Sequence, residues 1–499
     1  MNSIFIVLCL LIMFSNIYNS LYFYQLSHYN LFEFIKTSIK KISIIQLILF
    51  ILSIVLVSSY FCLIPLSLTV LYLVFKVWLK KRKVAFNLTT RIVRLIIMIS
   101  LLYLVTIHFI PDKYHLVSCS YFAIVFNLAG ALIIYPIEYL IQKYYLKKAK
   151  TKYILSKSQK IGITGSYGKT TTKNILNSIL KTRYLTAVSP RSYNTLMGLC
   201  KTINDKNLEM TDYLILEYGA SHNNDIKKLI KHFPVDYAIL TDIGPMHLET
   251  FKTMENIINT KFQLIEGLNS NGVGIINVDN KYIREYEIKT KAKIIKVSID
   301  EESDYQAINI KEFPDCTIFD IKNHEKIYPD IKINLVGRHN IYNTLTAFAL
   351  SRFIKLAEFK IRLGLTKIKQ VEKRLEMKKY DKMTIIDDSF SANPVGASNA
   401  IEYLKRLDGK KIIITPGMVE LGDASDEENK KLAEKIKEAC DVCILDSFKN
   451  EKIFTEVLGN SEVLYFVYKS FKEAYNKALT FYPTSHKNIL ILNDLPDNY

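Results

Sequence analysis

Residues 161–172 read Ile-Gly-Ile-Thr-Gly-Ser-Tyr-Gly-Lys-Thr-Thr-Thr, which is a short apolar strand, a glycine-bearing loop and the start of a helix. Glycines let the backbone approach an anion closely, and the first N–H groups of a helix point toward it. Lys169 adds a mobile positive charge, and Thr170 adds a hydroxyl suited to Mg²⁺. The stretch therefore predicts a nucleotide phosphate loop at the end of a strand in an α/β sheet.

One position departs from the general pattern of such loops. The common motif has a glycine five places before Gly168, where this chain has Ile163. The alternative interpretation is a tight strand-to-helix turn that carries a chance lysine. Apolar residues recur at helical spacing over residues 175–180, so an amphipathic helix follows the loop. The strand before the loop and the helix after it favour phosphate binding.

The composition bounds the number of domains and the class of partner. A chain of 499 residues suggests about three domains. Lys and Arg total 66 against 48 Asp and Glu, which gives a net charge of +18. Many basic residues stand beside apolar runs and the others are scattered, without the aromatic-interleaved basic patch typical of nucleic-acid binding. We therefore expect no nucleic-acid partner.

The seven cysteines do not suggest a disulfide framework. Cys440 and Cys443 have the spacing of a redox motif or of half a zinc site, but no second pair accompanies them. We interpret them as buried thiols at a helix-to-strand junction. Cysteine usage therefore places the soluble part in the cytosol.

The first 150 residues predict a membrane domain. Apolar runs occur at 3–19, 43–59, 61–79, 95–110 and 116–137, and two of them could form one re-entrant pair, so we expect four or five membrane-spanning helices. Basic residues follow the first, third and fifth runs, and the other connections have almost none. The positive-inside rule then places the N-terminus outside and the phosphate loop in the cytoplasm. The basic segment 141–157 is typical of a membrane-surface linker. The alternative is a very hydrophobic soluble helical domain.

Strands and helices alternate through the rest of the chain. Residues 212–217 predict a buried strand that ends at Glu217, where an α/β sheet can present a metal ligand beside a phosphate loop. Another strand, at 236–242, leads to His247, and Lys261 follows in a helical pattern. Residues 290–335 alternate apolar and polar side chains and predict antiparallel strands.

A helix is expected from residue 337 through Ile354, and a second α/β unit begins near 383. It has predicted strands at 411–415, 442–445 and 488–492 and a helix near 427–440. Strands that alternate with helices predict mostly parallel sheets.

These segments, taken in order over roughly residues 155–499, resemble the Mur ligase family, and most closely its MurF type. The motifs that carry the resemblance are residues 164–171, His247 with Lys261, residues 337–343 and residues 387–394. The resemblance implies two α/β domains, and together with the apolar runs it predicts a multidomain chain with an N-terminal α-helical transmembrane region. Residues 1–150 would form the membrane domain, 151–370 a P-loop central ATP-binding domain, and 371–499 a Rossmann-like C-terminal domain.

The resemblance also implies an activity. Mur ligases are ATP-dependent, ADP-forming enzymes that join a carboxylate to an amine through an acyl phosphate. The MurF type adds D-alanyl-D-alanine to a peptidoglycan precursor in cell-wall synthesis. The implied cofactors are ATP and Mg²⁺. The apolar runs and their basic flanks predict a multi-pass position in the cell membrane with the ligase domains in the cytoplasm.

Site residues are carried over from the matching motifs. Lys169, His247, Lys261 and Arg374 are the expected catalytic residues. Thr170 and Glu217 would hold one Mg²⁺, and His247 would hold a second with Lys261 as a carbamate, because a plain ammonium cannot ligate a cation. Asn340 would contact adenine, Arg374 the γ-phosphate and Asp388 the ribose. The expected phosphate contacts are Thr164, Gly165, Ser166, Tyr167, Gly168, Lys169, Thr170 and Thr171.

Several departures keep three hypotheses open. Phe262-Gln263 and Phe390-Ser391 stand where the family usually has Gly-Glu and Tyr-Asn, and apolar runs stand in place of its N-terminal uridine-binding domain. The first hypothesis is a membrane-anchored MurF-like ligase acting on a wall precursor. The second is a ligase that extends a lipid-linked or poly-amino-acid acceptor. The third is a non-catalytic ATP-binding membrane scaffold that recruits wall-synthesis enzymes.

Overall fold

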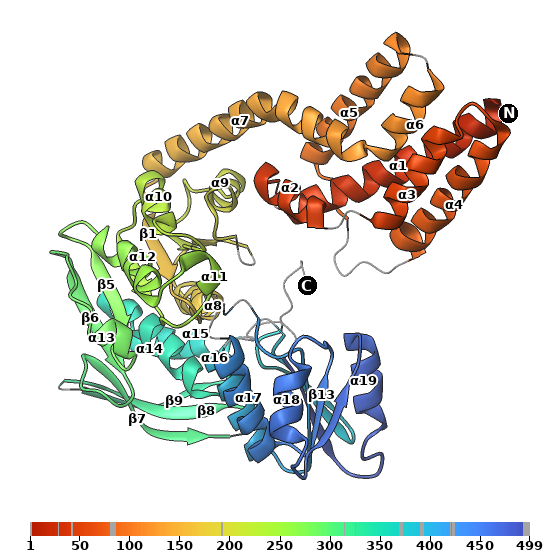
Figure 1. Ribbon diagram of the computed structural model, residues 1–499. Coiled ribbons are helices and arrows are strands. Elements are labelled where there is room, and N and C mark those ends of the chain that lie inside the picture. Colours follow the sequence, from red (N-terminus) through yellow and green to blue (C-terminus); the bar gives the residue numbers. More distant parts are fainter. Residues whose placement is uncertain are drawn as a thin grey trace. The chain divides into compact units, whose positions relative to one another are not determined.

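The computed structural model describes residues 2–27, 29–40, 43–79, 86–110, 112–190, 193–313, 315–324, 326–368, 373–389, 394–419, 421 and 425–492. The chain separates into two compact units, one of helices up to Tyr144 and one from Tyr145 onward (Figure 1). The second unit contains two sheets, one of nine strands and one of six.

The first unit consists of helices. They are α1 (Asn2–Leu26), α2 (Leu31–Lys40), α3 (Ile44–Val55), η1 (Tyr60–Cys62), α4 (Leu63–Leu73), η2 (Val74–Leu79), α5 (Thr90–Phe109), α6 (Lys113–Tyr121) and the start of α7 (Ala123–Leu155). Four stretches of the described residues are long and apolar enough to cross a membrane: Ser3–Leu26, Tyr60–Leu79, Thr90–Phe109 and Ala123–Leu155. The helix Ile44–Val55 is apolar but shorter.

The last predicted apolar run, 116–137, is not one helix. It is divided between α6 and α7, because the helix ends at Tyr121 and the next one begins at Ala123. Of the basic residues that follow the first and third runs, Lys41 and residues 80–83 lie outside the described part of the chain.

Polar contacts join the helices of the first unit. The buried Glu138 of α7 accepts a hydrogen bond of 2.7 Å from Nε of Arg94 in α5. Asn16 of α1 donates to the carbonyl of Ser120 at 3.0 Å. Asn127 of α7 donates to the hydroxyl of Ser20 at 3.0 Å. Such bonds between apolar helices fix which faces meet, since each buried polar group needs a partner.

The larger sheet has the strand order β2-β3-β1-β4-β5-β6-β7-β8-β9. Strand β1 (Gln159–Thr164) lies between β3 (Tyr213–Glu217) and β4 (Tyr237–Leu240), and both pair with it in parallel. Ile163 is in register with Glu217, so the end of β3 lies beside the start of the loop after β1. This edge of the sheet is where parallel α/β folds collect their functional side chains.

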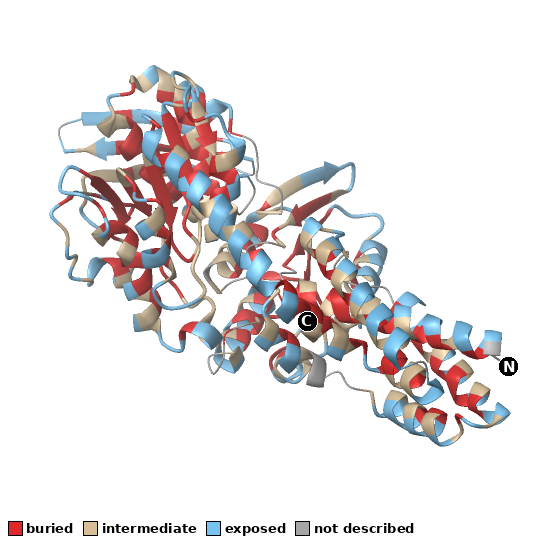
Figure 2. Ribbon diagram, turned by 90° about the horizontal axis from the view of Figure 1, so that it is seen from above, coloured by how far each residue is buried: buried red, intermediate tan, exposed pale blue. Residues whose placement is uncertain are grey.

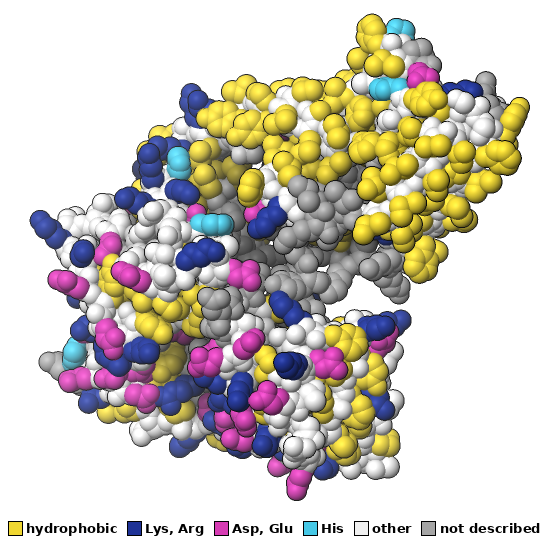
Figure 3. Space-filling model, viewed as in Figure 1, with side chains coloured by type: hydrophobic (Ala, Val, Ile, Leu, Met, Phe, Trp, Pro, Cys, Tyr) yellow, Lys and Arg dark blue, Asp and Glu magenta, His cyan; other side chains and the backbone are white. Residues whose placement is uncertain are grey.

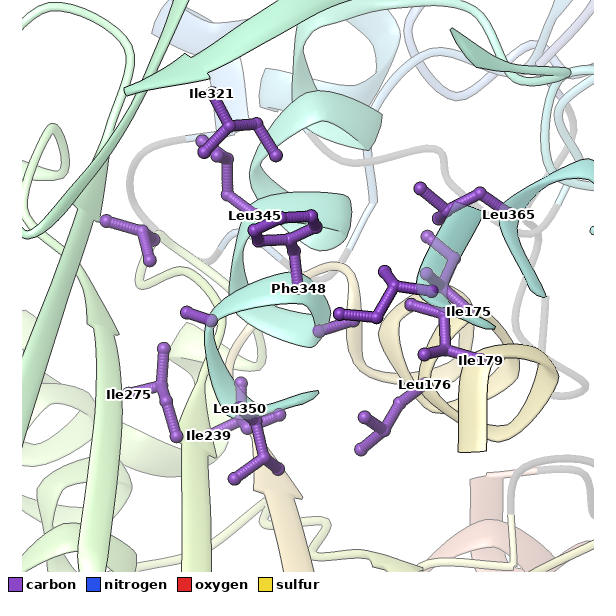
Figure 4. Close-up of a cluster of buried hydrophobic side chains, with 14 of the residues drawn as sticks. Ile175, Leu176, Ile179, Ile239, Ile275, Ile321, Leu345, Phe348, Leu350 and Leu365 are labelled. Carbon is purple, nitrogen blue, oxygen red and sulfur yellow. The ribbon is translucent and has the colours of Figure 1, made fainter. Parts of the chain in front are cut away.

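Helices cover both faces of this sheet, and alternate strand residues therefore enter different cores. On one face, α8 (Lys169–Leu180), α14 (Arg338–Phe353) and α15 (Glu358–Thr366) pack on the odd-numbered isoleucines of the strands (Figure 4). The other face carries α9 (Leu196–Asp205), α10 (Asp225–His232), α12 (Met254–Glu266) and the end of α7. Since both faces of β3, β4 and β5 are buried, these strands read as continuous apolar runs, whereas β7, β8 and β9 mix buried and more exposed residues.

The strands between residues 290 and 335 differ in part from the prediction. Strand β6 (Lys293–Ser298) pairs in parallel with β5 (Val273–Asn277), so the antiparallel prediction was wrong for β6. Strands β7 (Tyr305–Glu312), β8 (Thr317–Asn323) and β9 (Lys326–Ile333) pair antiparallel, as predicted.

The smaller sheet has the order β10-β11-β15-β12-β13-β14, and only the edge pair β10–β11 is antiparallel. Its strands are β10 (Glu376–Tyr380), β11 (Met383–Asp387), β12 (Lys410–Thr415), β13 (Val442–Leu445), β14 (Leu464–Val467) and β15 (Lys487–Ile491). Helices α16 (Pro394–Arg406), α17 (Ser425–Ala439) and α18 (Glu451–Leu458) share one core, and α19 (Phe471–Thr480) belongs to the other. Figure 2 shows the buried strands of both sheets between more exposed helices.

Cys440 follows α17 and Cys443 lies in β13, and both thiols are buried and free. This confirms the predicted helix-to-strand junction.

Candidate active site

The loop between β1 and α8 has a backbone that only glycine accommodates at two points. Gly165 has φ of +150°, and a Cβ there would lie 2.1 Å from the hydroxyl oxygen of Thr241. Gly168 has φ of +77° and precedes the first residue of α8, and its Cβ would lie 2.4 Å from Oδ1 of Asn343. A side chain at either position would clash with these groups, so the conformation of the loop requires both glycines.

The side chains of Thr164, Ser166 and Tyr167 turn toward protein atoms. The Thr164 hydroxyl donates to the carbonyl of Tyr218 at 2.8 Å, and the Ser166 hydroxyl donates to that of Gly244 at 3.0 Å. The Tyr167 hydroxyl donates to the carbonyl of Pro245 at 2.9 Å. These three residues therefore fasten the loop, in part to the segment that follows β4, and the backbone N–H of Ser166 also donates to the carbonyl of Asp242 at 2.7 Å.

Lys169 lies folded back over the loop. Its Nζ donates to the carbonyls of Gly165 at 2.7 Å and Ser166 at 3.0 Å. Burial lowers the pKa of Lys169 to about 8, the Glu217 carboxylate opposes this shift, and the positive charge of Arg374 adds to it. The ammonium is held by neutral carbonyls that an anionic ligand can replace.

Glu217, at the end of β3, is completely buried. Its Oε2 accepts a hydrogen bond of 3.2 Å from the hydroxyl of Thr170. Its Oε1 lies 2.5 Å from Nζ of Lys173. Sequence reasoning missed Lys173, although it stands four residues after Lys169 and so lies near it along α8.

Lys261 is buried in α12. Burial and the charge of Lys169 hold the pKa of Lys261 well below its usual range, with opposition from Asp225. Within the described ranges, its Nζ makes no hydrogen bond. His247 lies at the start of α11 (Leu248–Phe251) with φ of +53°. The electrostatic contacts thus bring Lys169, Glu217, Lys261 and Arg374 together.

Asn340 and Asp388, the residues expected to contact the nucleoside, form hydrogen bonds with other groups of the protein. Nδ2 of Asn340 donates to the carbonyl of Val336 at 2.8 Å, and its Oδ1 accepts from Nδ2 of Asn343 at 3.2 Å. Oδ1 of Asp388, which is buried, accepts from the N–H of Leu375 at 2.9 Å. Residues 390–393, the end of the last motif, lie outside the described residues.

His339 is a further group that the sequence did not single out. Burial and the charge of Arg374 lower the pKa of His339 to about 4, so its ring is neutral at physiological pH. Within the described part of the chain there is no cluster of three or more His, Cys, Asp or Glu with the arrangement of a metal site.

Two family models match the chain. The Mur ligase middle domain matches residues 163–351, and the Mur ligase glutamate ligase domain matches residues 373–492. Together these two matches cover more than half of the sequence.

Individual proteins and solved structures agree with these models. The chain is 31% identical over 275 residues to the UDP-N-acetylmuramoyl-tripeptide–D-alanyl-D-alanine ligase of Bacillus subtilis, which is 54% of this chain and 58% of that protein. A MurF ligase structure from Thermotoga maritima in complex with ADP aligns with a TM-score of 0.63 at 25% identity, over 71% of this chain and 80% of that one. A MurF structure from Acinetobacter baumannii gives 0.64 at 22% identity, over 71% and 77%.

The chain spans less than two thirds of the length of the curated relatives it matches. Both matched domains nevertheless fall, in the family's order, on the two sheets and on the loop that carries Lys169. The chain belongs to the Mur ligase family.

Proposed function

We propose that this chain is an ATP-dependent, ADP-forming ligase that joins a carboxylate to an amine through an acyl phosphate. In the manner of MurF, its role would be in peptidoglycan precursor synthesis. One observation carries the proposal: the loop after β1 brings Lys169 and Thr170 to the buried carboxylate of Glu217. The similarity to ligases of the MurF type supports the choice of reaction.

The loop fits a nucleotide phosphate. Gly165 and Gly168 allow the conformation of the loop, and the first N–H groups of α8 would point toward a bound phosphate. Lys169 would exchange its carbonyl partners for phosphate oxygens, and Arg374 would add charge at the γ-phosphate. Asn340 and Asp388 remain the proposed contacts to adenine and ribose. Thr164, Ser166 and Tyr167 remain proposed phosphate contacts, although their side chains bind protein groups and the N–H of Ser166 donates to Asp242.

The oxygen donors of Thr170 and Glu217 fit Mg²⁺, which prefers such hard ligands. Bound Mg²⁺ would neutralise phosphate charge. His247 and Lys261 are proposed to hold a second ion, with Lys261 as a carbamate. The buried amine of Lys261 fits this modification, because its lowered pKa favours the neutral form that reacts with CO₂ and no described group hydrogen-bonds to it.

The chemistry needs alignment and charge stabilisation. An oxygen of the substrate carboxylate attacks the γ-phosphorus of ATP, and the bond to ADP breaks. The amine then attacks the acyl carbon, phosphate leaves, and the nitrogen loses a proton. Lys169 and the loop N–H groups would hold the phosphates in line, and closing of the domains would bring Arg374 to complete the site.

We also propose that residues 1–150 form a multi-pass membrane domain with four or five spans. Residues 151–370 and 371–499, the latter Rossmann-like, would be the cytoplasmic ligase domains. The four long apolar helices support this proposal. On the face drawn in Figure 3, hydrophobic side chains gather over the N-terminal helices, whereas charged side chains are dispersed over the ligase unit. Exposed side chains such as Phe14, Leu71 and Leu104 would contact membrane lipid.

The same helices favour a second candidate, a ligase whose acceptor is lipid-linked. Purified full-length chain in detergent separates the candidates when it is given ATP, Mg²⁺ and D-alanyl-D-alanine with either a UDP-linked or a lipid-linked muramoyl tripeptide. We expect ADP release and a product heavier by the dipeptide, and a preferred acceptor that identifies the substrate class.

The scaffold hypothesis predicts nucleotide binding without turnover. If no acceptor and amine pair, including poly-amino-acid acceptors, supports ADP release by protein that binds MgADP, the ligase proposal is wrong and the scaffold remains. Mass spectrometry of native peptides and ¹³C-bicarbonate NMR would detect the carbamate on Lys261. Lys261→Arg is the control, because its guanidinium does not form a carbamate.

A further inference from the structure

Lys173 is a buried lysine for which the proposed reaction gives no role. It lies one turn after Lys169 on α8, and its side chain is only 2% exposed. Its Nζ lies 2.5 Å from Oε1 of Glu217 and donates to the carbonyl of Ser189 at 2.7 Å. A long charged side chain is rarely buried so completely unless it is paired.

The two oxygens of Glu217 have different partners. Oε1 faces the Lys173 ammonium, and Oε2 accepts from the Thr170 hydroxyl. Because Lys173 holds one oxygen, the carboxylate can offer only the other one to a cation beside Thr170. Lys173 therefore sets both the orientation of Glu217 and the number of oxygens it can give.

The charge balance at this point is also unusual for a cation site. The ammonium groups of Lys169 and Lys173 both act on the single carboxylate of Glu217. Two positive charges against one negative charge disfavour a divalent cation. A triphosphate brings several negative charges to the same place and reverses the sign, so the cation and the phosphates should bind together.

We infer that Lys173 is a positioning residue that makes divalent-cation binding at Glu217 dependent on bound nucleotide. This inference rests on the proposed function, because it concerns the same phosphate loop. Its consequence is that the site takes its metal as part of a metal–nucleotide complex and not from free solution.

The competing explanation is purely structural: Lys173 would merely neutralise a buried carboxylate. Loss of Lys173 would then lower thermal stability and would leave the coupling between cation and nucleotide unchanged. The dependence of cation affinity on nucleotide distinguishes the two explanations.

The test uses full-length protein in detergent and Mn²⁺ as the probe, with free Mn²⁺ measured by electron paramagnetic resonance with and without ADP. We expect ADP to tighten Mn²⁺ binding to the wild type at least tenfold. In Lys173→Gln, whose amide can still donate to Glu217, Mn²⁺ should bind at least tenfold more tightly without ADP, and the effect of ADP should shrink by the same factor. Glu217→Gln identifies where Mn²⁺ binds, since this substitution should abolish the ADP-dependent binding of Mn²⁺.

Lys173→Arg keeps the charge and should behave as the wild type does. Lys181→Gln is the matched control, because Lys181 lies exposed at the end of the same helix. Equal Mn²⁺ affinity of folded Lys173→Gln and wild type in the absence of ADP would overturn the inference. If Lys173→Gln does not fold, Mn²⁺ binding to the wild type still tests the inference. Binding of Mn²⁺ at Glu217 that does not depend on ADP would contradict it. A wild type that binds no ADP even with Mn²⁺ would instead contradict the proposed function.

Discussion

Two loops of the second compact unit, which begins at Tyr145 and is called the ligase unit here, share a glycine of positive φ but differ in the side chains around it. The loop after β1 and the loop after β12 each follow a buried parallel strand and contain a glycine with positive φ, Gly168 at +77° and Gly417 at +79°. The first is surrounded by charged groups, Lys169, Lys173 and Glu217. The second is enclosed by neutral amides.

The amides of the second loop bind its own backbone. Asn429 accepts from the N–H of Met418 at 2.7 Å and donates to its carbonyl at 3.1 Å, and Asn450 donates to the carbonyl of Pro416 at 2.9 Å. Both asparagines are buried. The difference between the two loops indicates that a glycine of positive φ is not sufficient for the proposed phosphate site. The charges beside the first loop make it suited to a ligand, whereas the second loop is fixed by bonds within the protein.

The largest effect should come from removing the charge of the first loop. Lys169→Met should lower the ligase rate on the order of 10³-fold, because the ammonium would stabilise charge on the transferred phosphate. Its thermal midpoint should not fall, since the buried ammonium is costly to desolvate. ADP release and thermal melting measure the two effects, with Lys181→Met as the control. A substantial residual rate would show that the first loop does not depend on the charge of Lys169.

Matched glycine substitutions should separate binding from stability. In Gly165→Ala the new Cβ would lie 2.1 Å from Thr241, and ADP affinity should fall at least tenfold, or about 1.4 kcal/mol. In Gly417→Ala it would lie 2.4 Å from Nδ2 of Asn450, and melting temperature should fall while ADP affinity stays the same. Titration with a fluorescent ADP analogue and thermal melting read out both variants. Weaker ADP binding by folded Gly417→Ala would contradict the structural role of the second loop.

Asn429→Ala should destabilise the folded ligase unit by about 1–3 kcal/mol, because it leaves the buried N–H and carbonyl of Met418 without this partner. Asn429→Asp keeps the acceptor for the N–H, so its loss should be smaller. Denaturant unfolding measures both. An unchanged midpoint for Asn429→Ala would show that the amide does not hold the loop.

The smallest effect depends on pH and concerns Asp242, whose backbone carbonyl accepts from Ser166 of the first loop at 2.7 Å. Burial raises the pKa of Asp242 to about 6, against opposing hydrogen bonds from Asn280 and Ile243. The protonated form thus contributes stability that is complete below about pH 4 and is lost as pH rises through 6.

Asp242→Asn should therefore stabilise the protein at pH 8 by about 1–2 kcal/mol, and the gain should disappear toward pH 4. Thermal melting as a function of pH checks this, and the amide retains the acceptor for Asn280. A gain that does not depend on pH would rule out titration of Asp242 as the cause.

Local sequence was sufficient for the phosphate loop and its flanking elements. The helix begins at Lys169 and the strand ends at Thr164, because glycine conformation, apolar periodicity and the helix start all act within a few residues. The buried strand that ends at Glu217 was predictable for the same reason. The placement of Thr170 beside Glu217 followed from the rule that parallel strands present their ends at one edge.

Features that depend on distant partners were not predictable in this way. Lys173 reads as a polar helix residue, and only the pairing of β1 with β3 brings it to Glu217. The residues of β6 alternate between apolar and polar as those of β7, β8 and β9 do, but β6 pairs in parallel with β5. The end of α6 at Tyr121 lies inside an unbroken apolar run, where hydropathy has no signal for a helix end.

Helix α7 has a consequence for any attempt to release a soluble ligase. The boundary between the two compact units falls at Tyr144, so the end of α7 belongs to the ligase unit. Ala149 is completely buried there. Tyr153 meets the ring of Phe233 edge-on and donates a hydrogen bond to the carbonyl of Pro234. A protease that cut after α7, near residue 157, would remove buried apolar side chains from the core beside the nine-stranded sheet. A shortened protein that begins at β1 should therefore aggregate, whereas one that retains the last turns of α7 should stay in solution.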